Sequence, residues 1–110
     1  MGELGRARKY FTKAFELREH ASEREKLLIT AAYYANVTEE QDKAAQTYRE
    51  TLAAYPRDDS AYGNLGLAYV AQADYQAAMG AMRQQLQLTP DHLSLYEDLA
   101  NSFVGLAAPR

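Results

Sequence analysis

The sequence predicts an all-α domain made of a repeated pair of helices. Apolar residues recur at spacings of three and four along the chain, and no stretch shows the sustained alternation that marks a strand. Pro56 and Pro90 are 34 residues apart, and each follows a helix-like run that a proline cannot continue. Ala44 and Ala78 repeat at the same spacing. We therefore expect helix–turn–helix units stacked along the chain.

Six helices are expected, separated by turns that contain prolines, acidic residues and small residues. Their predicted bounds are 4–19, 23–36, 39–55, 59–72, 75–88 and 92–106. Two of them start with a carboxylate, Asp58 and Asp74, which can accept hydrogen bonds from the free amides of the first turn.

Two further helix starts carry the capping-box pattern, in which a hydroxyl and a carboxylate or amide bond each other's backbone N–H groups. Ser22 with Glu25 has this pattern before the second helix. Thr38 with Gln41 has it before the third. We expect a side-chain cap at each of these places.

Length and composition limit the classes of protein that the chain can belong to. A length of 110 residues suits one small domain, and a net charge of −3 argues against a dedicated nucleic-acid binder. The absence of cysteine leaves no disulfide and no thiolate metal site. The N-terminal residues contain no apolar run that could serve as a signal peptide or a membrane span. We expect a single cytoplasmic domain over residues 1–110, with neither nucleic acid nor membrane as a partner.

The residues that recur resemble the tetratricopeptide repeat, a 34-residue family with the pattern W-x2-L-G-x2-Y, then A-x3-F, then P. The clearest unit reads Tyr62-x2-Leu65-Gly66-x2-Tyr69, Ala78-x3-Met82 and Pro90. The last helix repeats the opening half as Tyr96-x2-Leu99-Ala100-x2-Phe103. An earlier, degenerate unit reads Leu28-x2-Ala31-Ala32-x2-Ala35, Ala44-x3-Tyr48 and Pro56. The first helix is similar to a second helix of the repeat, with Ala7-x3-Phe11-x2-Ala14.

The resemblance implies a right-handed α-solenoid of antiparallel helix pairs, about six helices long and truncated at both ends. Residues 4–19 would be an orphan second helix, and residues 23–55 and 59–88 would each be a repeat. Residues 92–106 would be the first helix of a further repeat or a capping helix. A finer resemblance, in "KAFELREHASEREKL" and "VTEEQDKAAQTY", is to repeat segments attached to bacterial serine/threonine kinases and signalling regulators of the acidobacterial type.

The same resemblance gives the small residues a packing role. Gly66 and Ala78 stand where the two helices of a repeat cross. A glycine inside a helix costs up to about 1 kcal/mol relative to alanine, which favours a close approach at Gly66 over a loose segment. Gln85 replaces the alanine usual in the family, so its face is expected to be more open. The predicted crossing and packing residues are Leu28, Ala32, Ala44, Tyr48, Tyr62, Leu65, Gly66, Tyr69, Ala78, Met82, Pro90, Leu99 and Phe103.

No group of residues predicts catalysis, and we expect no enzyme, no cofactor and no metal site. Glu16 and His20 are four residues apart and could supply half of a metal site, whereas a structural site needs about four ligands. His92 is better explained by its place at a helix start. The first helix also carries a basic side, which we interpret as the exposed face of an amphipathic helix rather than a site for an anionic partner or a membrane surface: Arg6, Arg8, Lys9 and Lys13.

The predicted function is non-catalytic binding of a peptide or protein segment. In such stacks the first helix of each pair lines a concave groove, and solenoids commonly bind partners there. The predicted groove residues are Lys26, Ile29, Thr30, Tyr33, Asn36, Ser60, Asn64, Leu67, Val70, Glu97, Asp98 and Asn101. Because this set contains one lysine and two acidic residues, we expect a basic or neutral, partly apolar partner. The chain would be a scaffold or sensor part of a larger signalling protein.

The alternative function is self-assembly through the ends of the solenoid. The first and last helices each have an apolar face without a partner helix in the predicted stack, and solenoids normally need polar capping elements. These faces contain Leu4, Phe11, Phe15, Leu95, Leu99, Phe103 and Leu106.

Overall fold

The computed structural model describes residues 2–107, without the side chains of Leu4 and Ala107. It contains six α-helices over that range: α1 (Gly2–Glu16), α2 (Glu23–Tyr33), α3 (Gln41–Ala54), α4 (Asp59–Ala71), α5 (Tyr75–Leu88) and α6 (Leu93–Ala107). A 3₁₀ turn, η1 (Arg18–His20), follows α1, and a π-helical turn, η2 (Tyr34–Thr38), continues α2. No strand occurs between residues 2 and 107. The all-helical prediction is confirmed, and the predicted helix bounds agree with the observed ones to within a turn.

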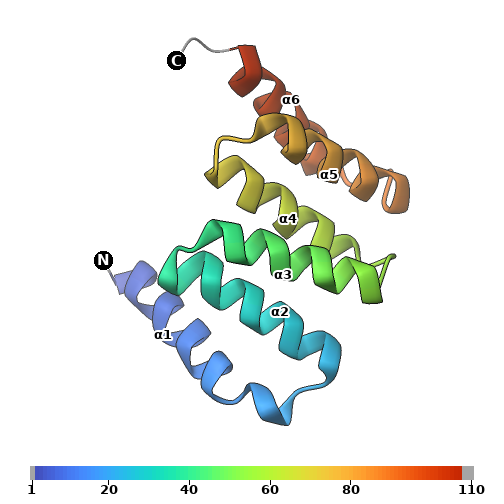
Figure 1. Ribbon diagram of the computed structural model, residues 1–110. Coiled ribbons are helices and arrows are strands. Elements are labelled where there is room, and N and C mark those ends of the chain that lie inside the picture. Colours follow the sequence, from blue (N-terminus) through green and yellow to red (C-terminus); the bar gives the residue numbers. More distant parts are fainter. Residues whose placement is uncertain (1, 108–110) are drawn as a thin grey trace.

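The helices form a stack in chain order. Figure 1 shows α1 and α2 at one end, α3 and α4 in the middle, and α5 and α6 at the other end. Each helix packs against the next one along the chain, and the contact between α4 and α5 is the most extensive. The stack measures 41 × 33 × 23 Å. This arrangement is consistent with the predicted solenoid of helix pairs.

Three of the four predicted helix caps are present. Ser22 and Glu25 form the complete capping box at the start of α2. The carboxylates of Asp58 and Asp74 accept hydrogen bonds from the amides of residues 61 and 77 at the starts of α4 and α5. These bonds satisfy backbone donors that have no partner inside the helix.

The predicted cap at Thr38 was wrong. Helix α2 continues through the π-helical turn, so Thr38 is the last residue of that turn and its hydroxyl donates to the carbonyl of Tyr34. Glu39 then takes a left-handed conformation, with φ of 60°, and ends the helix. Helix α3 begins after Glu40 without a side-chain cap. The hydroxyl was therefore used by the preceding helix before it could serve the following one.

The core consists largely of alanine. Ala31 of α2, Ala44 and Ala45 of α3, and Ala61 and Ala68 of α4 are buried together with larger residues such as Tyr48 and Leu65. Burial raises the pKa of the Tyr48 hydroxyl to about 12. Because a methyl group is the only side chain at many contact points, the helix backbones lie close to one another along α2, α3 and α4.

Gly66 lies where α4 meets α5. A Cβ atom placed on Gly66 would be 3.4 Å from Met82 and 3.7 Å from the backbone carbonyl of Ala78, which are ordinary contact distances. The two backbones therefore approach closely at Gly66 and Ala78, yet room for one methyl group remains. Gly105 of α6 is tighter, because a Cβ there would be 2.8 Å from the Tyr75 ring.

Gln85 corrects the expectation of an open face. Its side chain is buried, with 4% exposed, and it fills the space beside Gly63, where a Cβ would be 2.9 Å from the amide nitrogen of Gln85. The long side chain thus occupies a volume that a glycine on the facing helix leaves empty. Phe103, expected to pack, is 62% exposed because α6 is the last helix of the described chain and no later helix covers it.

Replacing Gly66 or Gly105 with alanine should change the stability of the chain in opposite directions. G66A should leave the free energy of unfolding unchanged or raise it by up to about 1 kcal/mol, since the methyl fits and alanine favours a helix. G105A should lower it by about 1 kcal/mol or more, because the Tyr75 ring must move. Thermal and urea unfolding of the two variants measure the difference. A loss of stability in G66A equal to that in G105A would contradict the packing described at α4 and α5.

Candidate binding groove

A groove runs between α4 and α6 on the face that carries the first helices of the pairs, α2, α4 and α6. We call this face the groove face. One cavity of about 210 Å³ lies between α4 and α6 and is lined by Ser60, Asn64, Leu67, Gln85 and Asp98, among others. A second cavity of about 170 Å³ extends it toward Val70 and Asn101. Leu67, Met82 and Asp98 line both cavities, so the two are continuous.

The floor of this groove contains an unusual polar group. The amide oxygen of Gln85 is buried and accepts no hydrogen bond from the described residues. A buried acceptor without a donor costs roughly 1–3 kcal/mol, so it destabilises the free protein. Gln85 also lines the cavity between α4 and α6, so a buried polar side chain stands at the floor of the groove. Asp98, half-buried on α6, places a carboxylate in the same cavity.

A third cavity lies on the groove face between α2 and α4, beside α1. Its volume is about 390 Å³, and it is lined by Ile29 of α2 and by Ser60 and Asn64 of α4. Tyr10, Phe11 and Ala14 of α1 line it as well. Helix α1 therefore borders this part of the groove face, where the predicted stack has no helix.

Two predicted groove residues lie elsewhere. Lys26 and Thr30 line a cavity of about 410 Å³ at the end of the stack, together with α3 residues such as Gln46 and Thr47. The ammonium of Lys26 is 3.3 Å from the Glu19 carboxylate and 3.5 Å from that of Glu23, and the hydrogen bond from Lys26 to Glu19 raises the pKa of Lys26. These two carboxylates neutralise the only lysine predicted in the groove.

The other predicted groove residues also lie at different places in the fold. Tyr33 is covered by α1, because its ring stacks on the Phe15 ring with 4.0 Å between centroids. The amide of Asn36 donates to the carbonyl of Ala32 on its own helix. Glu97 is exposed on α6. The structure thus brings together Ser60, Asn64, Leu67, Val70, Asp98 and Asn101. Of the predicted α2 residues, Ile29 shares a cavity with Ser60 and Asn64, whereas Lys26 and Thr30 line a different one.

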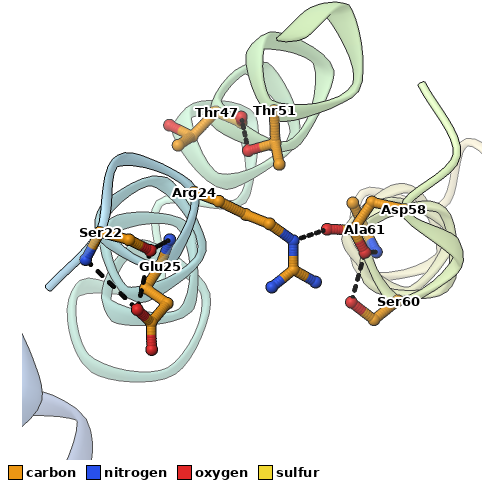
Figure 2. Close-up of polar contacts among 8 residues, drawn as sticks. All are labelled: Ser22, Arg24, Glu25, Thr47, Thr51, Asp58, Ser60 and Ala61. Carbon is orange, nitrogen blue, oxygen red and sulfur yellow. Dashed lines mark hydrogen bonds and ion pairs between the residues drawn. The ribbon is translucent and has the colours of Figure 1, made fainter. Parts of the chain in front are cut away.

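The start of α4, and with it Ser60 and Asn64, is positioned by an ion pair from the preceding repeat. Arg24 of α2 donates through Nε to Asp58, with 2.6 Å between the atoms, and the two residues are one 34-residue period apart. Figure 2 shows Arg24 reaching from α2 to Asp58, which also accepts from the Ser60 hydroxyl and the Ala61 amide. One carboxylate therefore caps α4, orients Ser60 and joins two repeats.

Asp58 stays ionised despite its burial, with 3% of its side chain exposed. Burial opposes ionisation, but hydrogen bonds from Ser60, Arg24 and the Ala61 amide outweigh it and lower the pKa of Asp58 below its ordinary value of 3.8. Since the pKa is lower in the folded chain than in the unfolded one, the stabilisation is present above that ordinary value. It is lost as the pH falls through the pKa of the folded state.

The described residues give no sign of a metal centre. No group of three or more histidine, cysteine, aspartate or glutamate side chains within residues 2–107 is arranged to hold a metal ion. Helix α1 ends at Glu16, and His20 follows in the 3₁₀ turn, so the two residues do not share one continuous α-helix. Likewise, none of the helices assigned between residues 2 and 107 is long and apolar enough to cross a membrane.

Residues 59–92 match the family model of the tetratricopeptide repeat. The matched segment comprises α4, α5 and the turn before α6, which are the elements that form the floor and one wall of the groove. The match supports the tetratricopeptide family for this part of the chain, and a repeat of this kind points to a protein–protein interaction module. No curated protein matches the chain.

Three features of the site were missed in the sequence. Gln85 departs from the repeat pattern, and a glutamine that faces a glycine on the neighbouring helix is a signal for a buried polar side chain. The contact of Tyr75 with Gly105 joins residues 30 positions apart and has no local signature. The position of α1 on the groove face depends on the stacking of Phe15 on Tyr33, which no spacing reveals.

The ion pair at Asp58 makes a prediction about stability and pH. D58A should lower the free energy of unfolding at pH 7 by about 1–2 kcal/mol, because both the helix cap and the partner of Arg24 are lost. D58N keeps a cap and should cost less than about 1 kcal/mol, since half-exposed Arg24 remains solvated.

The difference in stability between the native chain and D58N should shrink below about pH 4, where Asp58 begins to take up a proton. Chemical unfolding at pH 7 and at pH 3 measures this difference. A constant difference at both values would contradict the lowered pKa of Asp58.

Proposed function

We propose that the groove between α4 and α6 binds a peptide or protein segment that is basic or neutral and partly apolar. The observation that carries this proposal is the buried side chain of Gln85, which lines a cavity and whose amide oxygen has no hydrogen-bond partner among the described residues. A turn of the Gln85 amide toward the cavity would let that oxygen accept from a backbone or side-chain N–H of the partner. The match of residues 59–92 to the tetratricopeptide repeat supports the same class of function. Leu67, which is exposed on α4, offers apolar contact beside it.

The charge of the groove favours a cationic partner. Asp98 lines both cavities between α4 and α6, and Glu97 lies next to it on α6. The one lysine predicted in the groove, Lys26, lines a different cavity with residues of α3 and is paired with Glu19 and Glu23. Opposite charges across an interface mainly increase the association rate and the selectivity of binding. We further propose that the chain acts as a scaffold or sensor part of a larger signalling protein, as the resemblance of its N-terminal segments to kinase-linked repeats suggests.

The test combines binding with stability in a single substitution. Q85M keeps a side chain of similar length and removes the unpaired oxygen, so it should raise the melting temperature. The same change should weaken binding of a fluorescein-labelled basic, leucine-containing peptide by about tenfold, since one buried hydrogen bond is lost. Q84M, at the exposed neighbouring position, should change neither quantity. An acidic peptide of equal length and leucine content should bind more weakly than the basic one to the native chain.

The outcomes distinguish a binding site from a structural glutamine. If Q85M lowers both stability and affinity, Gln85 is a packing residue and the proposed hydrogen bond is absent. If the acidic peptide binds more tightly than the basic one, the proposed charge of the partner is wrong. D98N should reduce the preference for the basic peptide while leaving the apolar contribution in place.

A second candidate function is self-assembly through the C-terminal helix. Helix α6 exposes five large apolar side chains: Leu93, Tyr96, Phe103, Val104 and Leu106. Of the face predicted on this helix, Phe103 and Leu106 are exposed, whereas Leu95 is buried. Exposed apolar patches of this kind often mark sites of association. The apolar face predicted on the first helix contributes less, because Phe11 and Phe15 are half-buried against α2 and the side chain of Leu4 lies outside the described residues.

Self-assembly predicts a concentration-dependent mass. Sedimentation equilibrium of the native chain should show association that F103D abolishes, because a carboxylate would then have to be buried in the contact. T12A, on the distant helix α1, serves as the control. A native chain that remains a monomer at millimolar concentration would exclude this function and leave the peptide-binding proposal untouched.

A further inference from the structure

Helix α1 does not occupy the place that its sequence pattern predicts. The resemblance made residues 4–19 an orphan second helix, which would pack on the end of the stack formed by α2 and α3. Leu27, Tyr34 and Thr47 stand there at the positions that Ala61, Ala68 and Ala81 hold one period later. Those three alanines are buried with residues of α3, whereas Leu27, Tyr34 and Thr47 line the open cavity of about 410 Å³.

Instead, α1 lies along the groove face of α2. The Phe15 ring stacks on Tyr33 at an interplanar angle of 12°, and the Arg18 guanidinium lies 3.8 Å from the centre of the same Phe15 ring. Arg8 donates to the backbone carbonyl of Val37, with 3.0 Å between the atoms. Phe11 lines the cavity that Ser60 and Asn64 also line. The contacts of α1 are thus with residues that line, or directly follow, the groove face of α2.

Three residues of α1 that contact or border the groove face lie on one side of the helix. Arg8, Phe11 and Phe15 are related as i, i+3 and i+7, which is the spacing by which amphipathic helices bind grooves. Val37 lies in the π-helical turn that ends α2. The last carbonyl groups of a helix lack a partner inside the helix, and they form the negative end of its dipole. A cation at the position of Arg8 is therefore favoured there, and aromatic rings are favoured next to Tyr33.

We propose that the groove face between α2 and α4 is a site for an amphipathic helix with an arginine and two aromatic residues in this spacing. Helix α1 is its occupant within the chain, and a partner helix of the same chemistry displaces it. This inference rests on the proposed function, since it identifies a class of partner for the groove face. Because α1 is tethered next to the site, it competes with a partner for it. The apparent association constant of the partner is the intrinsic one multiplied by the fraction of molecules in which the site is free.

The absence of tryptophan from the sequence allows a direct test of displacement. F15W places a single indole against Tyr33 in the full chain. The added ligand is a labelled peptide with the sequence of residues 2–20, "GELGRARKYFTKAFELREH". We expect the peptide to bind while the indole emission of F15W shifts to the red and becomes more accessible to acrylamide. A peptide in which both phenylalanines are replaced by alanine is the control and should do neither.

Affinity provides a second readout. F15A weakens the internal contact, so the full-length F15A chain should bind the labelled peptide about tenfold more tightly than the native chain does. E16A changes an exposed residue one position along the same helix and should bind the peptide as the native chain does.

Each outcome separates this inference from the proposed function. If the peptide of residues 2–20 binds but the F15W emission stays unchanged at saturation, or F15A binds no more tightly than E16A, then α1 is not displaced. If the leucine-containing basic peptide binds and the peptide of residues 2–20 does not, the inferred partner chemistry is wrong while groove binding stands. If neither binds, both proposals fail.

Discussion

The structure depends on the close approach of helix backbones that small side chains permit. Alanines of α2, α3, α4 and α5 meet at the helix contacts, and Gly66 adds one more point without a side chain. Few large residues are fully buried, so stability comes from many short contacts along the helices rather than from a few large anchors. The same closeness sets α4 and α6 on either side of α5, whose Met82 and Gln85 side chains line the groove between them.

The groove face combines features that stabilise the chain with features that do not. Asp58 joins two repeats, caps α4 and holds the Ser60 hydroxyl, so the wall of the groove is fixed by several hydrogen bonds at once. Gln85 does the opposite, because its buried oxygen has no donor within the described chain. Under the proposed function, a partner's N–H group would complete this oxygen, and binding would recover the stability lost there.

Local signals made most of the fold predictable. The 34-residue spacing and the carboxylates at helix starts gave six helices and three caps correctly, because each depends on residues close together in the chain. The cap at Thr38 failed because a continuing helix and a starting helix compete for one hydroxyl, and the pattern does not show which one wins. The site was harder to predict. The burial of Gln85 depends on Gly63 of the facing helix, and the position of α1 depends on Tyr33, so neither follows from spacing within one segment.

The ion pair between Arg24 and Asp58 links equivalent points of successive repeats, and it therefore adds a tether across the first junction of the stack. At the second junction the equivalent of Asp58 is His92, and no ion pair spans that junction within residues 2–107. The first junction therefore has an ionic tether in addition to its packed alanines. The second has packing in its place, since the Tyr75 ring of α5 fills the space beside Gly105 of α6.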